Sequence, residues 1–123
     1  MMDCIFCNIS KDKIIHEDPY WITIYDEFPV SKGHVLIIPK RHISNITELK
    51  SNEWAYLFSA IMFIEGYLKE KFNCDGFNIG INQGKAAGQT IEHLHIHVIP
   101  RYNGDIEDPK GGVRGVIPDK MKY

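Results

Sequence analysis

The chain has 123 residues, 44% of them apolar, which suits one compact domain and excludes two separate hydrophobic cores. Its formal net charge is −2 and its fourteen Lys and Arg residues form no basic stripe, which argues against a nucleic-acid partner. No apolar stretch approaches membrane-spanning length, and the N-terminus has no basic region followed by an apolar run. We therefore expect a soluble, cytoplasmic protein that contacts no membrane.

The first third of the chain predicts two strands. Residues 21–25 alternate with a period of two, and residues 34–39 form a run rich in β-branched side chains that ends at a proline. Residues 26–33 between them are rich in turn formers. An antiparallel pair of strands is the expected result.

A single long helix is predicted to follow. Ser51 can cap its start, and apolar residues then recur every three or four positions. This spacing is typical of a helix that packs its apolar stripe into the core. The stripe consists of Trp54, Leu57, Phe58, Ile61, Ile64, Leu68 and Phe72.

Two further strands are predicted at 77–82 and 93–100, with a glycine-containing loop at 83–90 between them. The tail at 102–123 is rich in glycine, proline and charge, so we expect little regular structure there. These elements indicate a single α+β domain over residues 1–123. In it, an antiparallel sheet of about five strands packs against one long helix.

Three histidines occupy alternate positions of the last predicted strand. His93, His95 and His97 share one face, while the apolar residues between them share the other, because strand side chains alternate. Coincidence is a poor explanation for such a pattern in an apolar strand. A neutral imidazole, with a reference pKa of about 6.5, is a good nucleophile toward phosphorus near neutral pH.

The loop before this strand carries groups that suit a phosphate. Gly84 and Gly88 free backbone N–H groups, and Gln89 and Thr90 add an amide and a hydroxyl. Glycine loops also commonly connect strands without any other role. The position of the loop directly before the histidines favours the functional interpretation.

Residues 93–99 (HLHIHVI) resemble the signature of the histidine triad (HIT) superfamily, His-φ-His-φ-His-φ-φ with φ apolar, at every position. The likeness runs from Cys4–Cys7 (CIFC) through residues 33–42 (GHVLIIPKRH) and fades after Arg101. It implies a homodimer with a continuous sheet, in which the apolar side of the helix is shared between core and subunit contact. It also implies that His95 attacks the α-phosphorus of a nucleotide, giving a nucleotidyl-histidine that water hydrolyses.

The same resemblance assigns roles around the substrate. His97 would contact the phosphate, and its backbone carbonyl would hold the attacking ring in the required tautomer. Asp26 would bind the ribose hydroxyls, although from the residues alone it is equally a turn former. His34 would support the triad, without an assigned catalytic role. The phosphate site would comprise Asn82, Gly88, Gln89 and Thr90, and the base wall Ile5, Phe6, Ile9 and Ile24, which equally suit an ordinary core.

Two of the three cysteines, Cys4 and Cys7, have a spacing that allows both thiolates to reach one metal ion. From the residues alone, a metal site, a redox pair and buried thiols all remain open. Zinc-containing HIT proteins resemble this chain and imply a site made of this pair, His42 and His93. Four protein ligands would make such a zinc structural. Cys74 is interpreted as a small residue near the helix end.

Three functions therefore compete. The first is a hydrolase or transferase that cleaves purine nucleotide conjugates, such as adenosine phosphoramidates or dinucleoside polyphosphates, at the α-phosphate. The second is a metal hydrolase in which His93, His95 and His97 jointly bind catalytic zinc. The third is a nucleotide-binding regulatory module. Two departures from the family leave substrate choice open: no tryptophan follows Arg101, and Glu27 places a charge near the base.

Overall fold

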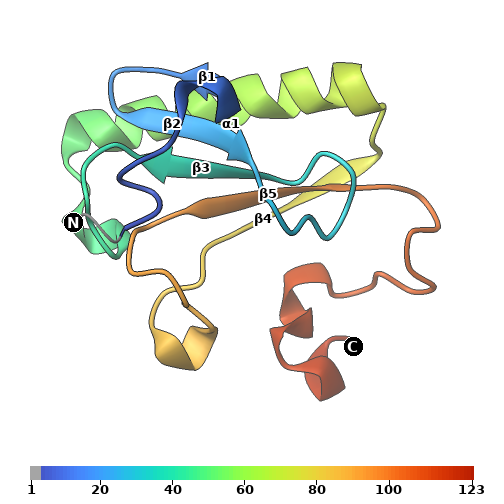
Figure 1. Ribbon diagram of the computed structural model, residues 1–123. Coiled ribbons are helices and arrows are strands. Elements are labelled where there is room, and N and C mark those ends of the chain that lie inside the picture. The colour runs from blue at the N-terminus through green and yellow to red at the C-terminus, as the bar shows by residue number, and fades with distance from the viewer. Residues whose placement is uncertain (1–3) are drawn as a thin grey trace.

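The computed structural model describes residues 4–123 (Figure 1). The first three residues, part of the N-terminus in which we expect no targeting signal, lie outside that range. One antiparallel five-stranded sheet has the order β1-β2-β3-β5-β4, and a long helix lies along one of its faces. This is the α+β architecture that the sequence predicts. The elements are β1 (Ile14–Glu17), β2 (Trp21–Tyr25), β3 (Val35–Pro39), α1 (Ser51–Phe72), β4 (Gly76–Gly80) and β5 (Ile96–Arg101).

The sheet differs from the sequence prediction at β1 and at β5. The sequence located four of the strands but not β1, whose four residues carry no clear alternation and whose pairing with β2 is irregular between Ile14 and His16. Strand β5 begins at Ile96 rather than at residue 93. The N–H of Leu94 donates to the Ile43 carbonyl at 2.7 Å instead of joining the ladder. His93 and His95 therefore lie before the strand, outside its ladder.

The start of α1 also differs from the prediction. Ser51 is the first helical residue, and Lys50 is the cap. The Lys50 N–H donates to Glu53 Oε1 at 2.8 Å, so a carboxylate in the first turn of the helix accepts the N–H of the capping residue. At the other end Asn73 takes a left-handed conformation with φ 54°, which asparagine tolerates better than most residues.

Only part of the predicted apolar stripe of α1 reaches the core. Leu57, Ile64 and Leu68 are buried, but Trp54 is 37% and Phe58 67% exposed. The sheet covers a single strip of the helix, and these two side chains lie to one side of it. Ala60, which the sequence pattern did not select, lies on the covered strip.

Both faces of the sheet are covered, which explains why every residue of β3 is buried. Val35 and Ile37 pack in the cluster under α1, whereas Leu36 and Ile38 pack in a second cluster on the opposite face. Phe6 from the N-terminal segment belongs to that second cluster. The two faces thus separate a main core from a smaller layer beneath the N-terminal segment.

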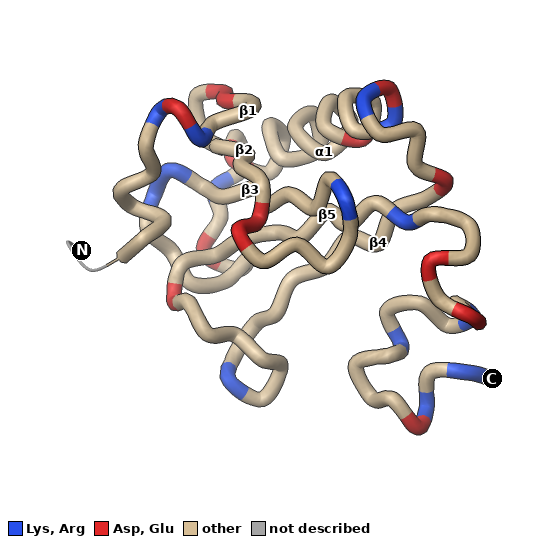
Figure 2. Tube along the Cα trace, turned by 45° about the vertical axis from the view of Figure 1, so that its right-hand side comes forward, with Lys and Arg blue, Asp and Glu red and all other residues tan. Residues whose placement is uncertain are grey.

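Beyond β5 the chain forms short turns. Two 3₁₀ segments, Gly112–Val116 and Pro118–Lys120, are the regular structure after Tyr102. Figure 2 shows lysine and arginine interspersed with aspartate and glutamate along the chain, without a stripe of one sign. Among the described residues, no helix has the length and apolarity needed to cross a bilayer.

Candidate active site and metal site

A cavity of about 700 Å³ opens on the face of the sheet opposite α1. It brings together ten of the residues predicted to contact substrate, from five different parts of the chain. They are Ile5, Phe6, Ile9, Ile24, Asp26, Asn82, Gly88, Thr90, His95 and His97. Its volume suits a ligand of nucleotide size.

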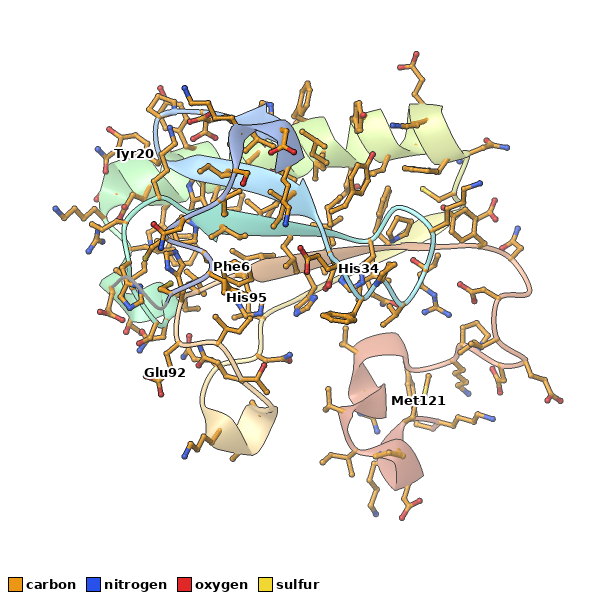
Figure 3. The ribbon with its side chains drawn as sticks, viewed as in Figure 1. Phe6, Tyr20, His34, Glu92, His95 and Met121 are labelled. Carbon is orange, nitrogen blue, oxygen red and sulfur yellow. The ribbon has the colours of Figure 1, made fainter. Side chains whose placement is uncertain are left out.

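Side chains alternate between the core and the cavity along β5 and the two residues before it. Leu94, Ile96 and Val98 pack in the cluster under α1, while His95 and His97 line the cavity on the other face. The pairing of His97 with Leu36 places it beside the buried layer of β3. Figure 3 shows His95 next to Phe6, and the two ring centroids are 5.1 Å apart.

The backbone fixes the tautomer of His95. Its Nδ1 lies 2.9 Å from the carbonyl oxygen of His93, so Nδ1 carries the proton and donates it. Nε2 then keeps its lone pair, and the ring borders the cavity. The sequence interpretation gave this task to the carbonyl of His97, and that assignment was wrong. Because the segment before Ile96 leaves the ladder, the His93 carbonyl is available to the ring two residues later.

A second chain of hydrogen bonds fixes His97. The Val30 N–H donates to His34 Nδ1 at 3.1 Å, so the proton of a neutral His34 resides on Nε2. Nε2 lies 2.9 Å from Nδ1 of His97 and donates to it. The neutral ring of His97 therefore carries its proton on Nε2. Burial is the main cause that lowers the pKa of both rings, and the neighbouring histidines lower that of His97 further.

The carboxylate of Asp26 also lies close to the ring of His34. Its Oδ1 accepts the Phe28 N–H at 2.9 Å, as a turn former does, and its Oδ2 lies 3.4 Å from His34 Nε2. It also lines the cavity, and its role toward the ribose stays a prediction. Asp26, His34 and His97 have ligand atoms close enough for a metal ion. The proton on His34 Nε2 occupies the lone pair that an ion would need, so hydrogen bonding accounts for the cluster.

Only some residues of the loop before the histidines line the cavity. Gly88, with φ 90°, and Thr90 line the cavity, but Gln89 does not. The Gln89 side chain accepts the Gly84 N–H at 2.9 Å and donates to the carbonyls of Ser44 and Ile91 at 3.1 Å each. Its amide closes the loop instead of facing the cavity.

The apolar wall of the cavity extends beyond the predicted residues. Phe6 and Ile24 are buried, as expected of a wall, whereas Ile5 is 61% exposed at the mouth. Leu36 completes the wall and was not predicted. Its direct pairing with Ile24 across β2 and β3 is the signal that would have found it, because opposed residues share a face.

A second cluster adjoins the triad and contains the four predicted metal ligands. The ligand atoms of Cys4, Cys7, His42 and His93 all lie within 4.8 Å of one another. His93 Nδ1 is 3.3 Å from Cys4 Sγ, 3.5 Å from Cys7 Sγ and 3.1 Å from His42 Nδ1. Ligand atoms around a tetrahedral zinc stand about 3.3–3.8 Å apart, given metal–ligand bonds of about 2.0–2.3 Å.

The protonation of His93 also suits a metal. Its Nε2–H donates to the Pro39 carbonyl at 2.8 Å, which leaves the Nδ1 lone pair directed at the thiols. Burial is the main cause that lowers the pKa of His93, so the ring is neutral, as a ligand must be. The donor set, its spacing and its tautomer fit a closed zinc site.

Comparison with known proteins identifies the family of this chain. The family model described as HIT domain matches residues 8–104, well over half of the chain. The chain belongs to the HIT family. A HIT-like protein of Methanocaldococcus jannaschii, described as uncharacterized, is 37% identical over 123 residues, which cover 96% of this chain and 95% of that protein.

Two other HIT proteins bear on activity and metal. A bis(5′-adenosyl)-triphosphatase of Dictyostelium discoideum is 44% identical over 80 residues, which cover 65% of this chain and 54% of that enzyme. The crystal structure of a zinc-bound histidine triad family protein from Mycobacterium smegmatis is 34% identical, with a TM-score of 0.75. That match covers 98% of this chain and 91% of the other. The HIT family thus includes a nucleotide hydrolase and a zinc-bound member.

Proposed function

We propose that this HIT protein cleaves purine nucleotide conjugates, such as nucleoside phosphoramidates or dinucleoside polyphosphates, at the α-phosphate. The observation that carries the proposal is the hydrogen bond from His95 Nδ1 to the His93 carbonyl, at 2.9 Å. It directs an unprotonated Nε2 toward the cavity, which is what attack on phosphorus requires. The Dictyostelium relative, a hydrolase of a dinucleoside triphosphate, supports the reaction class.

The reaction has two steps. His95 Nε2 forms a bond to the α-phosphorus while the bond from phosphorus to the leaving group breaks, and the leaving group takes up a proton from solvent. Water then attacks the phosphorus and releases a proton to solvent, the bond to His95 breaks, and a nucleoside monophosphate departs. His97, with its proton on Nε2, donates a hydrogen bond to a phosphate oxygen throughout. We assign the phosphates to Asn82, Gly88 and Thr90, and the ribose hydroxyls to Asp26.

The arrangement of the rings favours this reaction over a catalytic zinc held by the triad. His93 faces the two thiols, whereas His95 and His97 border the cavity. Within residues 4–123, no group of ligand atoms unites all three rings. We therefore propose zinc at Cys4, Cys7, His42 and His93 as a structural ion. It would hold the N-terminal segment against His93 and supply no step of the reaction.

Trapping the intermediate tests the proposed function. With an α-labelled adenosine phosphoramidate or dinucleoside polyphosphate, wild type should retain label after rapid quenching. His95→Ala should bind no label and lose at least about a thousandfold in kcat. Its zinc content should stay unchanged. Loss of zinc in this variant would favour the metal hydrolase, and turnover without label in wild type would contradict a covalent path. Substrate binding with negligible turnover would favour the regulatory module.

We further propose a homodimer and a cytoplasmic location. Phe58 and Met62 leave 67% and 76% of their surface exposed on α1, an apolar area that a second copy would cover. Thiols that serve as zinc ligands must remain reduced, which suits the cytoplasm.

A further inference from the structure

An ion pair lines the part of the cavity beside β1 and β2. Lys13 Nζ and Glu27 Oε1 are 2.7 Å apart, and both side chains line the cavity. Lys13 immediately precedes β1 and Glu27 follows β2, whereas His95 and His97 belong to the β5 region. The sheet order places β1, next to Lys13, three strand spacings, about 14 Å, from β5, and β2, which precedes Glu27, two strand spacings, about 10 Å, from β5.

The floor of the cavity between β1 and β5 is apolar, and the Asp26 carboxylate also borders the cavity. Ile24 on β2 and Leu36 on β3 form its floor, and Phe6 packs in the same buried cluster. From β5 toward β1 the cavity therefore presents phosphate-binding groups, then apolar side chains, then a pair of opposite charges. A nucleotide has the same order of parts: a phosphate, a base with apolar faces, and the polar edge of that base.

We propose that Lys13 and Glu27 bind the edge of the base and make the site prefer guanine to adenine, an inference that rests on the proposed function. The two side chains are 54% and 65% exposed, so they can reorient toward a ligand without being desolvated first. Each can exchange part of its contact with the other for a contact with the base.

The choice between purines follows from their edges. Guanine presents two adjacent N–H donors, N1–H and N2–H, which one carboxylate accepts as a bidentate pair, and its O6 accepts from an ammonium group. Adenine offers the carboxylate only its N6–H donors, and its N1 lone pair repels a second carboxylate oxygen. Glu27 and Lys13 together thus form more charge-assisted bonds with guanine than with adenine.

The sequence supplies a control for an ordinary surface ion pair. Lys40 and Glu17 also approach to 2.7 Å and are 35% and 47% exposed, but neither lines the cavity. If the Lys13–Glu27 pair only stabilised the surface, neutralising either pair would leave base preference unchanged.

The experiment compares kcat/KM for guanosine, inosine and adenosine 5′-phosphoramidates in wild type, Glu27→Gln and Glu17→Gln. Wild type should prefer guanosine to adenosine by about tenfold, with inosine between them because it lacks the N2 amine. Glu27→Gln should reduce that preference to about threefold or less, mainly through KM, because the base lies far from the reacting phosphorus. Glu17→Gln should keep the wild-type preference.

Binding of GMP and AMP, measured by calorimetry, provides a readout independent of turnover. Equal or adenine-favouring values in wild type would overturn the inference, as would a guanine preference that survives in Glu27→Gln or falls equally in Glu17→Gln. If wild type cleaves none of the three substrates, the proposed function fails, and the calorimetric ratio still decides base preference. If it cleaves all three at equal rates, only the base preference fails.

Discussion

His34 is buried behind the triad and determines which nitrogen of His97 carries its proton. It does so from a position just before β3, whereas His97 lies on β5. The Val30 N–H fixes which nitrogen of His34 holds a proton, and that proton fixes His97. Only 2% of the His34 surface is exposed. Burial lowers the pKa of His34 more than the nearby Asp26 carboxylate raises it. The ring is therefore kept neutral at neutral pH.

This burial predicts a pH dependence of stability. Between the lowered folded-state pKa of His34 and the unfolded value of about 6.5, the unfolded chain binds more protons than the folded one. The free energy of unfolding should therefore fall as pH drops below about 6.5 and recover above it. Urea denaturation at pH 7.5 and 5.5 measures the difference.

His34→Gln provides the comparison for that measurement. Glutamine does not titrate, yet its amide N–H can still donate toward His97, so the variant should fold and lose part of the stability difference between the two pH values. His34→Leu should lose the same part and also weaken catalysis, because His97 then lacks its donor. A stability difference identical in wild type and His34→Gln would contradict the assignment.

At the scale of elements, the N-terminal segment contacts the residues before β5 through the cluster of Cys4, Cys7, His42 and His93. Between Cys4 and Ser10 the chain forms no strand, and Cys4 and Cys7 lie within 3.5 Å of the ring of His93. The carbonyl of this same residue positions His95. The proposed zinc would thus link the position of Phe6 in the cavity wall to the position of His95, the proposed nucleophile.

Removal of the metal should therefore loosen this segment. Chelation should release about one zinc per chain and lower Tm by about 10 °C or more, because the ion binds the folded chain preferentially. Cys7→Ser should lower Tm similarly and respond little to the chelator. Differential scanning calorimetry with metal analysis measures both quantities.

Cys74 offers a matched control because it is buried far along the sequence from the cluster. Cys74→Ser should keep its zinc and its response to the chelator, whatever it loses in stability. A wild-type protein without bound metal, and with a Tm that a chelator leaves unchanged, would contradict the zinc proposal.

At the scale of the whole molecule, the two sides of α1 have different surroundings. On one side Phe63 stacks on His16 of β1 at 4.2 Å, and Tyr56 contacts Tyr20 before β2. On the other side Phe58 and Met62 are open to solvent. A second copy that covers this open side would explain why α1 carries more apolar residues than its own sheet can bury.

Oligomeric state tests this explanation. Sedimentation velocity should give a mass near twice 14.2 kDa for wild type. Met62→Glu should shift the protein toward the monomer at the same concentration, because it places a charge in the proposed contact. Phe63→Ser, on the opposite side of the helix, should leave the mass unchanged. A monomeric wild type at micromolar concentration would contradict the dimer.

Local patterns in the sequence predicted much of this protein. The alternation of His93, His95 and His97 with apolar residues is enough to separate a core face from a reactive face, because side-chain direction along an extended chain follows from covalent geometry. Helix periodicity located α1 within one residue of its start. The same local reasoning assigned the apolar stripe too broadly, since exposure depends on what covers the helix.

Contacts between distant residues decided the rest. Pairing of β2 with β3 places Leu36 beside Ile24, and the loop after β2 places the Val30 N–H within hydrogen-bond distance of His34. The tautomer of His95 depended on where the strand ladder ends, which no local pattern records. Sequence alone determines which side chains can share a face. Only the folded chain decides which donor meets which acceptor, because those partners come from strands and loops far apart along the backbone.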